Sequence, residues 1–386
     1  MNKYDLKRNY PMLTGKFRKQ GYDWWWHNFT GIDENTGEEK TFFIEYFTVN
    51  PALGGKEPVL GQLQENKLNG KKPSYLMVKA GWWGKDKTQL HRFIGWDDVK
   101  LSANKKTGFV LHAKDCACTE TTMCGSVDIS QKDCAEHPEY MCDAGSMSWN
   151  LSVKKVVTFN VGYGAGSLFR NLKAFEMYWH AQGIKALYSG TVTANGKKYI
   201  VKEQESFGYA DKNWGSNFTS PWVWLSSWDV YSKTQNKRLD NTAFEIGGGC
   251  PVAFGIHLNR KLLGEIWYEG KDYEFNFSKF WTGSKTFFEC EETETEIIWH
   301  VIQETRKAIL DTRIKCEKKD MLLVNYEDPL GQKRHNRLWN GGTGNGTLML
   351  YKKQGKKKIL LDEMTVNHVG CEYGEYCNPD GTPEKQ

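Results

Sequence analysis

The chain has 386 residues, of which 14% are aromatic and 26% are charged, and its formal net charge is +5. This length exceeds that of a typical single domain, so two domains are expected. The modest charge argues against a nucleic-acid partner, because no RNA- or DNA-binding motif accompanies the short lysine runs near residue 355.

The first twenty residues are polar and charged, and they lack the apolar core of a signal peptide. No later stretch approaches the ~20 consecutive apolar residues of a membrane-spanning helix. We therefore expect a cytoplasmic protein without an integral membrane segment. The sequence does not specify its oligomeric state.

Most of the chain has the composition of β structure. It contains 16 Trp, 18 Tyr and 19 Phe together with 38 Gly, and aromatic strands punctuated by glycine turns are typical of all-β proteins. The strongest strand candidates are residues 41–49 and 272–277, and the second alternates with three aromatics on one face. Turns at Asn195-Gly196 and Gln354-Gly355 predict hairpins, with a strand over 198–207 after the first.

Five of the ten cysteines lie between residues 116 and 142, with His112 and His137 nearby. A zinc site is one interpretation, but the spacing contains no Cys-x-x-Cys pair. Reduced thiols in a long loop over residues 112–145 are the favoured interpretation, because an intracellular chain rarely keeps disulfides. No metal is expected.

A weak internal repeat indicates two similar halves. Trp25-Trp26-His27 and Tyr178-Trp179-His180 each precede a turn that contains Asn and Gly, and aromatic strands follow both turns. We place a boundary near residue 172, after a glycine-rich joint at 162–167. This gives an N-terminal β domain over 1–172 and a C-terminal β domain over 173–386, each the size of a small barrel or sandwich.

Several familiar cofactor and catalytic motifs are absent from the sequence. The glycine-rich stretch 340–346 runs into a strand, whereas a phosphate loop needs a following helix and a lysine. There is no Gly-x-Ser-x-Gly elbow and no His-Glu-x-x-His zinc helix. No cofactor is expected.

The stretch 209–228 concentrates the most unusual chemistry of the chain. Trp222 and Trp224 share one strand face with Ser226, and Asp211-Lys212 precede them. This arrangement suits a large apolar ligand that needs a proton. It equally suits an ordinary aromatic core with a surface ion pair at its edge.

Other titratable residues have two interpretations each. Alternation places His257 opposite Ile256 and Leu258, so it points into a barrel lumen if those two pack between sheets. It would then be a candidate acid or base, although a single histidine more often has a structural role. Glu45, in an otherwise apolar strand, is either on the solvent face or functional.

Residues 209–215, Tyr-Ala-Asp-Lys-Asn-Trp-Gly, resemble the Tyr-Ala-Glu-Lys-Asn-Trp-Gly motif of the tocopherol cyclase family. Residues 179–183 and 188–190 are similar to that family's Trp-His-x-x-Gly and Tyr-Ser-Gly segments. Residues 255–257 and 273–275 are similar to its Gly-Ile-His and Tyr-Glu-Phe segments. The order along the chain is preserved, and the likeness extends from about residue 175 to 280.

The resemblance implies two packed lipocalin-like antiparallel β-barrels. It also implies a cofactor-independent, non-redox conversion of a large apolar molecule, isoprenoid-like or polycyclic, by cyclisation, hydration or isomerisation. Tryptophan faces would stabilise a carbocation. The alternative function is a lipocalin-like carrier that binds an apolar ligand without chemistry.

The resemblance also assigns candidate roles to residues. Asp211 is the candidate acid and His257 is its runner-up, with Lys212 and Asn213 positioning the acid. The predicted substrate-binding residues are Trp214, Trp222, Trp224, Asn213, His180 and Tyr209. Trp222 and Trp224 are expected to face a cavity in the second barrel.

Overall fold

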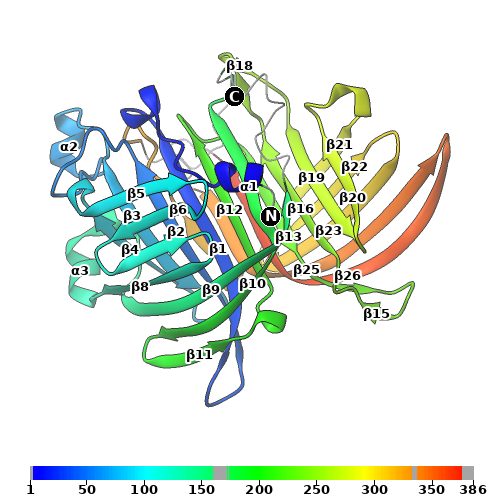
Figure 1. Cartoon of the computed structure of the whole chain (residues 1–386), viewed down its shortest axis with the longest axis horizontal. Helices are drawn as coiled ribbons and strands as arrows, with labels where there is room; N and C mark the ends of the chain where they lie inside the picture. Colours follow the sequence, from blue (N-terminus) through cyan, green and yellow to red (C-terminus); the bar gives the residue numbers. More distant parts are fainter. Residues whose placement is uncertain (1–2, 160–171, 173, 333–336, 376–386) are drawn as a thin grey trace.

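The computed structural model describes residues 3–159, 172, 174–332 and 337–375, and it contains two large antiparallel sheets (Figure 1). The α-helices among these residues are short: α1 (Lys3–Arg8), α2 (Gln64–Leu68) and α3 (Gln131–Glu136). The 3-10 helices are η1 (Gly15–Arg18), η2 (Trp96–Asp98), η3 (Pro138–Tyr140), η4 (Glu203–Glu205), η5 (Phe280–Thr282) and η6 (Lys318–Asp320). The predicted all-β class with two lipocalin-like β units is confirmed.

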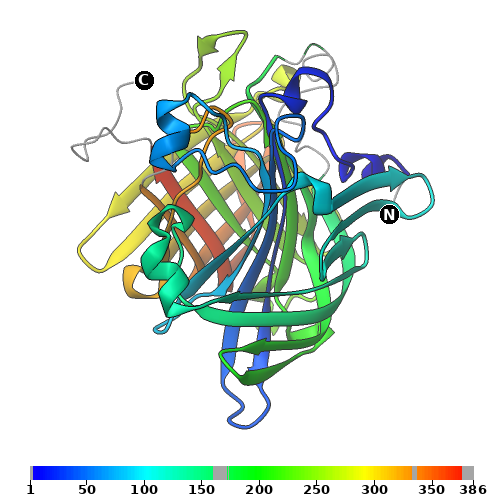
Figure 2. The same ribbon diagram turned by 90° about the vertical axis from the view of Figure 1, so that its left-hand side faces the viewer.

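The first sheet has twelve strands in the order β4-β3-β2-β1-β11-β10-β9-β8-β7-β6-β5, and β12 pairs with both β1 and β10. The sheet curls so that β4 approaches β8. Figure 2 shows the curvature of its strands from the side. Its strands are β1 (Tyr22–Asp33), β2 (Glu39–Val49), β3 (Tyr75–Trp82), β4 (Thr88–Ile94), β5 (Val99–Asn104), β6 (Gly108–Ala113), β7 (Cys116–Thr119), β8 (Thr122–Ile129), β9 (Gly145–Phe159), β10 (Met177–Ala194), β11 (Lys197–Val201) and β12 (Gly208–Gly215).

The second sheet has the order β20-β19-β16-β13-β26-β25-β23-β22-β21, with β14, β15 and β24 attached beside it. Its strands are β13 (Trp222–Ser227), β14 (Asp229–Ser232), β15 (Lys237–Arg238), β16 (Ala243–Gly249), β19 (Lys261–Tyr268), β20 (Lys271–Asn276), β21 (Lys285–Glu292), β22 (Glu296–Glu304), β23 (Ala308–Glu317), β24 (Leu322–Val324), β25 (Arg337–Gln354) and β26 (Lys357–Glu375). A separate hairpin is formed by β17 (Val252–Ala253) and β18 (Ile256–His257).

The chain does not change sheets at the predicted boundary near residue 172. Strand β10 pairs with β9 on one edge and with β11 and β12 on the other, so it lies inside the first sheet. The change of sheet falls between Gly215 and Trp222, at the end of β12 and the start of β13. The expected glycine-rich joint at 162–167 lies outside the described residues.

The cysteine-rich segment is not the predicted long loop. It forms β7, β8 and α3, because apolar side chains such as Cys116, Cys118 and Met123 alternate toward the interior of the first sheet. All five cysteines of this segment carry free thiols. Within the described ranges, no group of three or more His, Cys, Asp or Glu side chains is placed to hold a metal ion.

The strand predictions over 41–49 and 272–277 correspond to β2 and β20, and both predicted hairpin turns are present. The strand predicted over 198–207 ends earlier, at Val201, because η4 interrupts it before β12 begins. None of the helices in the described part of the chain has the length and apolar composition needed to cross a lipid bilayer.

Each sheet encloses an apolar core of its own. A third core lies between the two sheets and contains residues of both, and it is called the shared core below. Trp25 and Phe29 face the interior of the first sheet, whereas Trp26, on the other face of β1, belongs to a cluster that also includes residues of the second sheet. Glycines of the second sheet make room for the indoles. A Cβ atom at Gly370 would lie 2.2 Å from Trp224, a contact that would require the ring to move.

A histidine bridges the two sheets at another point of their contact. Nδ1 of His368 in β26 lies 2.7 Å from Asp229 in β14, and its Nε2 lies 2.6 Å from Glu39 in β2. Burial alone lowers the pKa of His368, but the hydrogen bonds with the two carboxylates outweigh it and raise this pKa to about 9. The protonated imidazole therefore links carboxylates of both sheets at neutral pH.

We expect the His368 bridge to make stability fall at alkaline pH. A histidine whose pKa is raised in the folded state stabilises the fold fully below its unfolded pKa of 6.5 and loses this contribution as pH rises through about 9. Urea unfolding midpoints of the wild type should therefore fall between pH 7 and 10 more steeply than those of His368→Gln. Parallel pH profiles for the two proteins would contradict this expectation.

Candidate active site

The face of the first sheet that meets the second carries the most unusual titratable groups. Alternation along β12 directs Tyr209 and Asp211 toward this contact, and Tyr209 lies in the shared core. Neighbouring strands supply Trp24 from β1 and Trp179 from β10, since both pair with β12.

Asp211 is buried and is held by three aromatic donors. Trp179 Nε1 donates to Oδ2 at 2.9 Å, Trp24 Nε1 donates to Oδ1 at 3.3 Å, and the Tyr209 hydroxyl lies 3.2 Å from Oδ2. Burial raises the pKa of Asp211 to about 8, and the nearby charge of Glu372 adds to this, although the aromatic donors oppose it. Asp211 is thus a protonated carboxylic acid at neutral pH, the form a general acid needs.

The second sheet brings a further carboxyl to the same phenol. Glu245 of β16 accepts a hydrogen bond from the Tyr209 hydroxyl at 2.9 Å through Oε1. Burial raises the pKa of Glu245 well above its ordinary value. The Ser226 hydroxyl and the Trp224 indole also lie against this carboxyl, and with the Tyr209 hydroxyl they oppose the rise.

Two more carboxyls, the half-buried Glu372 and the buried Glu45, lie in the shared contact region. Glu372 of β26 accepts hydrogen bonds from Trp222 Nε1, at 2.9 Å, and from the Asn340 amide. Burial, with a smaller contribution from the charge of Glu45, raises the pKa of Glu372 to about 7, although the two hydrogen bonds oppose this rise.

Glu45 forms a buried ion pair with Lys79, whose Nζ lies 3.1 Å from Oε2. The Tyr326 hydroxyl donates to the same oxygen at 3.0 Å, and Lys79 Nζ sits 3.8 Å from the centre of the Tyr326 ring. Glu45 is therefore buried and paired, and it does not lie on the solvent face.

A small cleft opens beside the acids. Its volume is about 50 Å³, and its walls include Trp179, Trp222 and Leu263. The two indoles meet edge to face with ring centres 6.3 Å apart. Since Trp179 donates to Asp211 and Trp222 donates to Glu372, one indole separates the cleft from each carboxyl.

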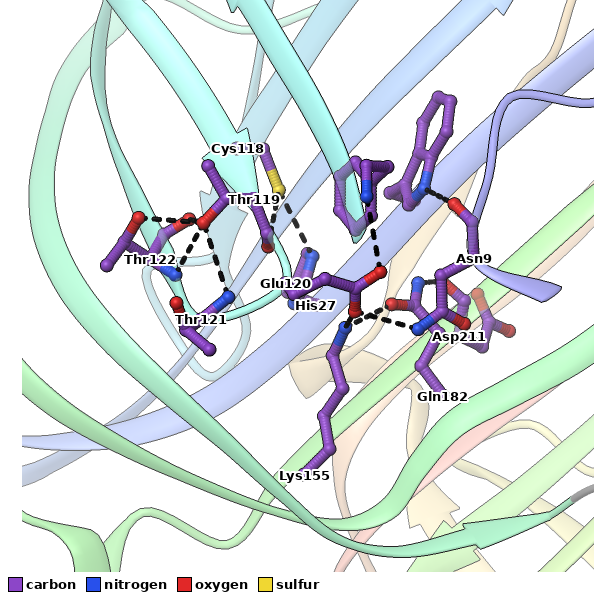
Figure 3. Close-up of polar contacts among 12 residues, drawn as sticks. Asn9, His27, Cys118, Thr119, Glu120, Thr121, Thr122, Lys155, Gln182 and Asp211 are labelled. Carbon is purple, nitrogen blue, oxygen red and sulfur yellow. Dashed lines mark hydrogen bonds and ion pairs between the residues drawn. The ribbon is translucent and has the colours of Figure 1, made fainter. Parts of the chain in front are cut away.

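A polar chain behind β12 supports the backbone at Asp211 (Figure 3). Gln182, at a bulge of β10, donates from Nε2 to the main-chain oxygen of Asp211 at 2.6 Å. Lys155 donates to the Gln182 side chain at 2.6 Å and forms an ion pair with Glu120 at 2.7 Å, and Asn9 also donates to Glu120. These contacts fix the direction in which the Asp211 side chain leaves its strand.

The sequence profile described as tocopherol cyclase-like matches residues 117–375, which is more than half of the chain. The protein belongs to the tocopherol cyclase-like family. The family resemblance predicted from the sequence motifs is thereby confirmed. A comparison with curated protein sequences gives no match.

Three solved structures are similar at 10% identity and a TM-score of 0.44 each. One is described as a putative AttH from Nitrosomonas europaea, and the match covers 90% of this chain and 93% of that one. For CghA with Sch210972, the match covers 92% of this chain and 89% of that one. For kievitone hydratase from Nectria haematococca, it covers 96% of this chain and 94% of that one.

The tocopherol cyclase-like motif of β12 divides between two faces of its strand. Tyr209 and Asp211 face the second sheet, and so does Asn213, which accepts a hydrogen bond from the Tyr22 hydroxyl at 2.9 Å. Lys212 and Trp214 alternate to the other face. Because consecutive side chains of a strand point to opposite faces of the sheet, Lys212 lies on the face opposite to the Asp211 carboxyl.

Lys212 lies inside the first sheet. It forms a fully buried ion pair with Asp23 of β1, and its Nζ lies 3.7 Å from the centre of the Trp25 ring. Burial lowers the pKa of Lys212 to about 8, although the charge of Asp23 raises it. This environment fits a structural ion pair rather than the positioning role predicted for Lys212.

Two further predicted binding residues also lie away from the acids. Trp214 stacks on Tyr178 with ring centres 5.5 Å apart, in a small separate core. His180 is buried and alternates with Trp179 along β10. Burial lowers the pKa of His180 well below its usual value, so the ring is neutral.

The prediction that Trp222 and Trp224 both face a cavity in the second barrel holds only in part, because Trp224 does not line the cleft and the cleft lies between the sheets. Trp222 lines the cleft. Trp224 packs on Tyr209 with ring centres 4.9 Å apart, within the shared core. The site therefore combines Asp211 from the first sheet with aromatics from the second.

His257 does not point into a barrel lumen. It is exposed on the β17–β18 hairpin, outside both sheets, and its neighbour Ile256 is 65% exposed. Phe254 and Gly255 both have positive φ values, so the chain reverses after two residues and no sheet continues on either side. Alternation would direct His257 into a lumen only along a longer strand than β18, which consists of Ile256 and His257.

Glu245 and Glu372 were not among the site residues predicted from the sequence. Each lies in a short stretch of its strand that is otherwise free of charged residues, within Ala243-Phe244-Glu245-Ile246 and Gly370-Cys371-Glu372-Tyr373. The same pattern drew attention to Glu45. A carboxyl flanked on both sides by apolar strand residues is therefore the feature that would have found all three.

Proposed function

We propose that the protein catalyses a cofactor-independent acid–base conversion of a large apolar molecule, by cyclisation, hydration or isomerisation. Asp211 delivers a proton to a carbon–carbon double bond of the substrate. The cation that forms lies against the indole faces of Trp179 and Trp222, which stabilise positive charge. Membership of the tocopherol cyclase-like family supports this class of chemistry.

The observation that carries the proposal is the state of Asp211. A buried carboxyl with a pKa near 8, surrounded by indoles and a phenol, holds its proton at neutral pH. Such a group can protonate a weak carbon base only where the resulting cation is stabilised at once. The aromatic walls and the neighbouring carboxyl of Glu372 provide this stabilisation.

The cleft beside the acids is smaller than the roughly 300–1,000 Å³ of a typical small-molecule site. We propose that Trp179 and Trp222 swing apart when the substrate enters, which would bring its reacting bond to Asp211. Separation of these two rings would also expose the carboxyls that they cover.

The test uses the purified 386-residue chain and apolar extracts of its source cells. The extract is incubated with the protein, or with heat-denatured protein as a control, and both are analysed by chromatography and mass spectrometry. An enzyme of the proposed kind yields a species of unchanged mass and altered retention, or a species heavier by one water. A bound ligand returned with the same mass and retention would instead favour the carrier.

A further inference from the structure

We propose that Glu245 is a second acid of this site, which resupplies Asp211 with a proton through the hydroxyl of Tyr209. This inference rests on the proposed function, because it concerns how the acid is restored after it has acted. It assigns Glu245 a positioning and relay role, and this residue is not expected to touch the substrate.

The geometry places one phenol between two carboxyls from different sheets. The Tyr209 oxygen lies 2.9 Å from Glu245 Oε1 and 3.2 Å from Asp211 Oδ2. A phenol has a single proton, so it donates fully to only one of the two carboxyls at a time. The other carboxyl then satisfies the phenol oxygen best by donating its own proton to it.

Two arrangements therefore exchange through one hydroxyl. In the first, Glu245 carries a proton and donates it to Tyr209, which donates to ionised Asp211. In the second, Asp211 carries a proton and donates it to Tyr209, which donates to ionised Glu245. Passage from the first to the second breaks the Glu245 O–H and Tyr209 O–H bonds and forms new O–H bonds on Tyr209 and Asp211, and no electron is transferred.

The surroundings favour Glu245 as the proton store. It lies in the second sheet, where the Ser226 hydroxyl and the Trp224 indole lie against its carboxyl and only partly offset the effect of burial on its pKa. Burial raises the pKa of Glu245 well above its usual range, and the charge of Asp211 raises it further. When Asp211 gives its proton to a substrate, its new negative charge draws the shared proton of Tyr209 toward it, and Glu245 replaces that proton.

The relay predicts that Asp211 and Glu245 titrate as a coupled pair. Two carboxyls coupled by more than about one pK unit lose their protons in two steps that belong to the pair. The indole Nε1–H groups of Trp24 and Trp179 report on Asp211, since both donate to its carboxyl. Their resonances in ¹⁵N–¹H spectra can be assigned from Trp24→Phe and Trp179→Phe, and followed between pH 5 and 10 without a substrate.

The series is made in a Glu372→Gln parent, because the charge of Glu372 also raises the pKa of Asp211 and Glu372 itself has a pKa of about 7. In this parent, both indole resonances should shift in two steps. Glu245→Gln should leave a single step. Tyr209→Phe keeps both carboxyls but removes the phenol hydroxyl that connects them. The difference between the two apparent pKa values should therefore become smaller. Glu245→Asp shortens the acid by one methylene and should also reduce this difference, which keeps the test informative if Glu245→Gln fails to fold.

A two-step titration that persists in Glu245→Gln, or a difference between the two apparent pKa values that Tyr209→Phe leaves unchanged, would overturn the relay. Such results would not affect the proposed acid, whose own test is the turnover of Asp211→Asn. Conversely, full turnover by Asp211→Asn would overturn the proposed function even where the coupled titration is found.

Discussion

Replacement of Asp211 by asparagine is expected to lower kcat/KM by about 100- to 10,000-fold, the usual contribution of a general acid. The amide has nearly the shape of the carboxylic acid, and its oxygen still accepts from Trp179 Nε1, which donates to Asp211 at 2.9 Å. What the variant loses is the proton. The loss should therefore appear in kcat, while the far-ultraviolet circular dichroism and the unfolding midpoint stay near those of the wild type.

A matched control is Asp97→Asn, since Asp97 is exposed on η2, away from the shared core. It makes the same chemical change and should retain wild-type turnover. Equal turnover by Asp211→Asn and Asp97→Asn would show that Asp211 does not supply the proton.

The second large effect concerns stability and Lys212. Lys212→Met is expected to lower the free energy of unfolding by about 3–5 kcal/mol at neutral pH, because the loss of one partner leaves the other charge of a buried pair uncompensated. Here the remaining group is Asp23, which keeps only the hydrogen bond that the Met12 amide donates at 2.7 Å. Urea unfolding measures the change.

Removal of both charges separates the ion pair from other roles of Lys212. The double variant Asp23→Asn with Lys212→Met should be more stable than Lys212→Met alone, since no buried charge is left without a partner. The difference in free energy of unfolding between the double variant and Lys212→Met should become smaller toward acidic pH. Burial raises the pKa of Asp23 to about 6 even though Lys212 lowers it, so without Lys212 this pKa rises further and the carboxyl of the single variant takes up a proton as the pH falls. Additive effects of the two substitutions would contradict the pairing.

Much of the fold could be predicted from the sequence because local patterns determine it. The alternating aromatics of residues 41–49 and the Asn195-Gly196 turn specify β2 and the β10–β11 hairpin with little help from distant residues. The true change of sheet, between Gly215 and Trp222 and not near residue 172, was not predictable in this way. It depends on β10 pairing with β9 on one edge and β12 on the other, and such pairing joins residues far apart in the chain.

The site was predicted in part. The motif containing Tyr209 and Asp211 was recognised, and so were Trp222 and Trp224, because their residue types are unusual at that spacing. The groups that surround the Asp211 carboxyl were not predicted from the sequence. Trp24, 187 positions away, reaches it only because β1 pairs with β12, and Glu245 reaches Tyr209 only because two separate sheets pack face to face.

The most direct test of the central claim is turnover in deuterium oxide, once a substrate has been found. Carboxyl and phenol protons exchange with solvent, so Asp211 would deliver deuterium, and the wild-type product should carry one deuterium on the carbon that was protonated. Asp211→Asn should form little or no labelled product. A wild-type product without deuterium on carbon, or equal labelling by Asp211→Asn, would contradict proton delivery by Asp211.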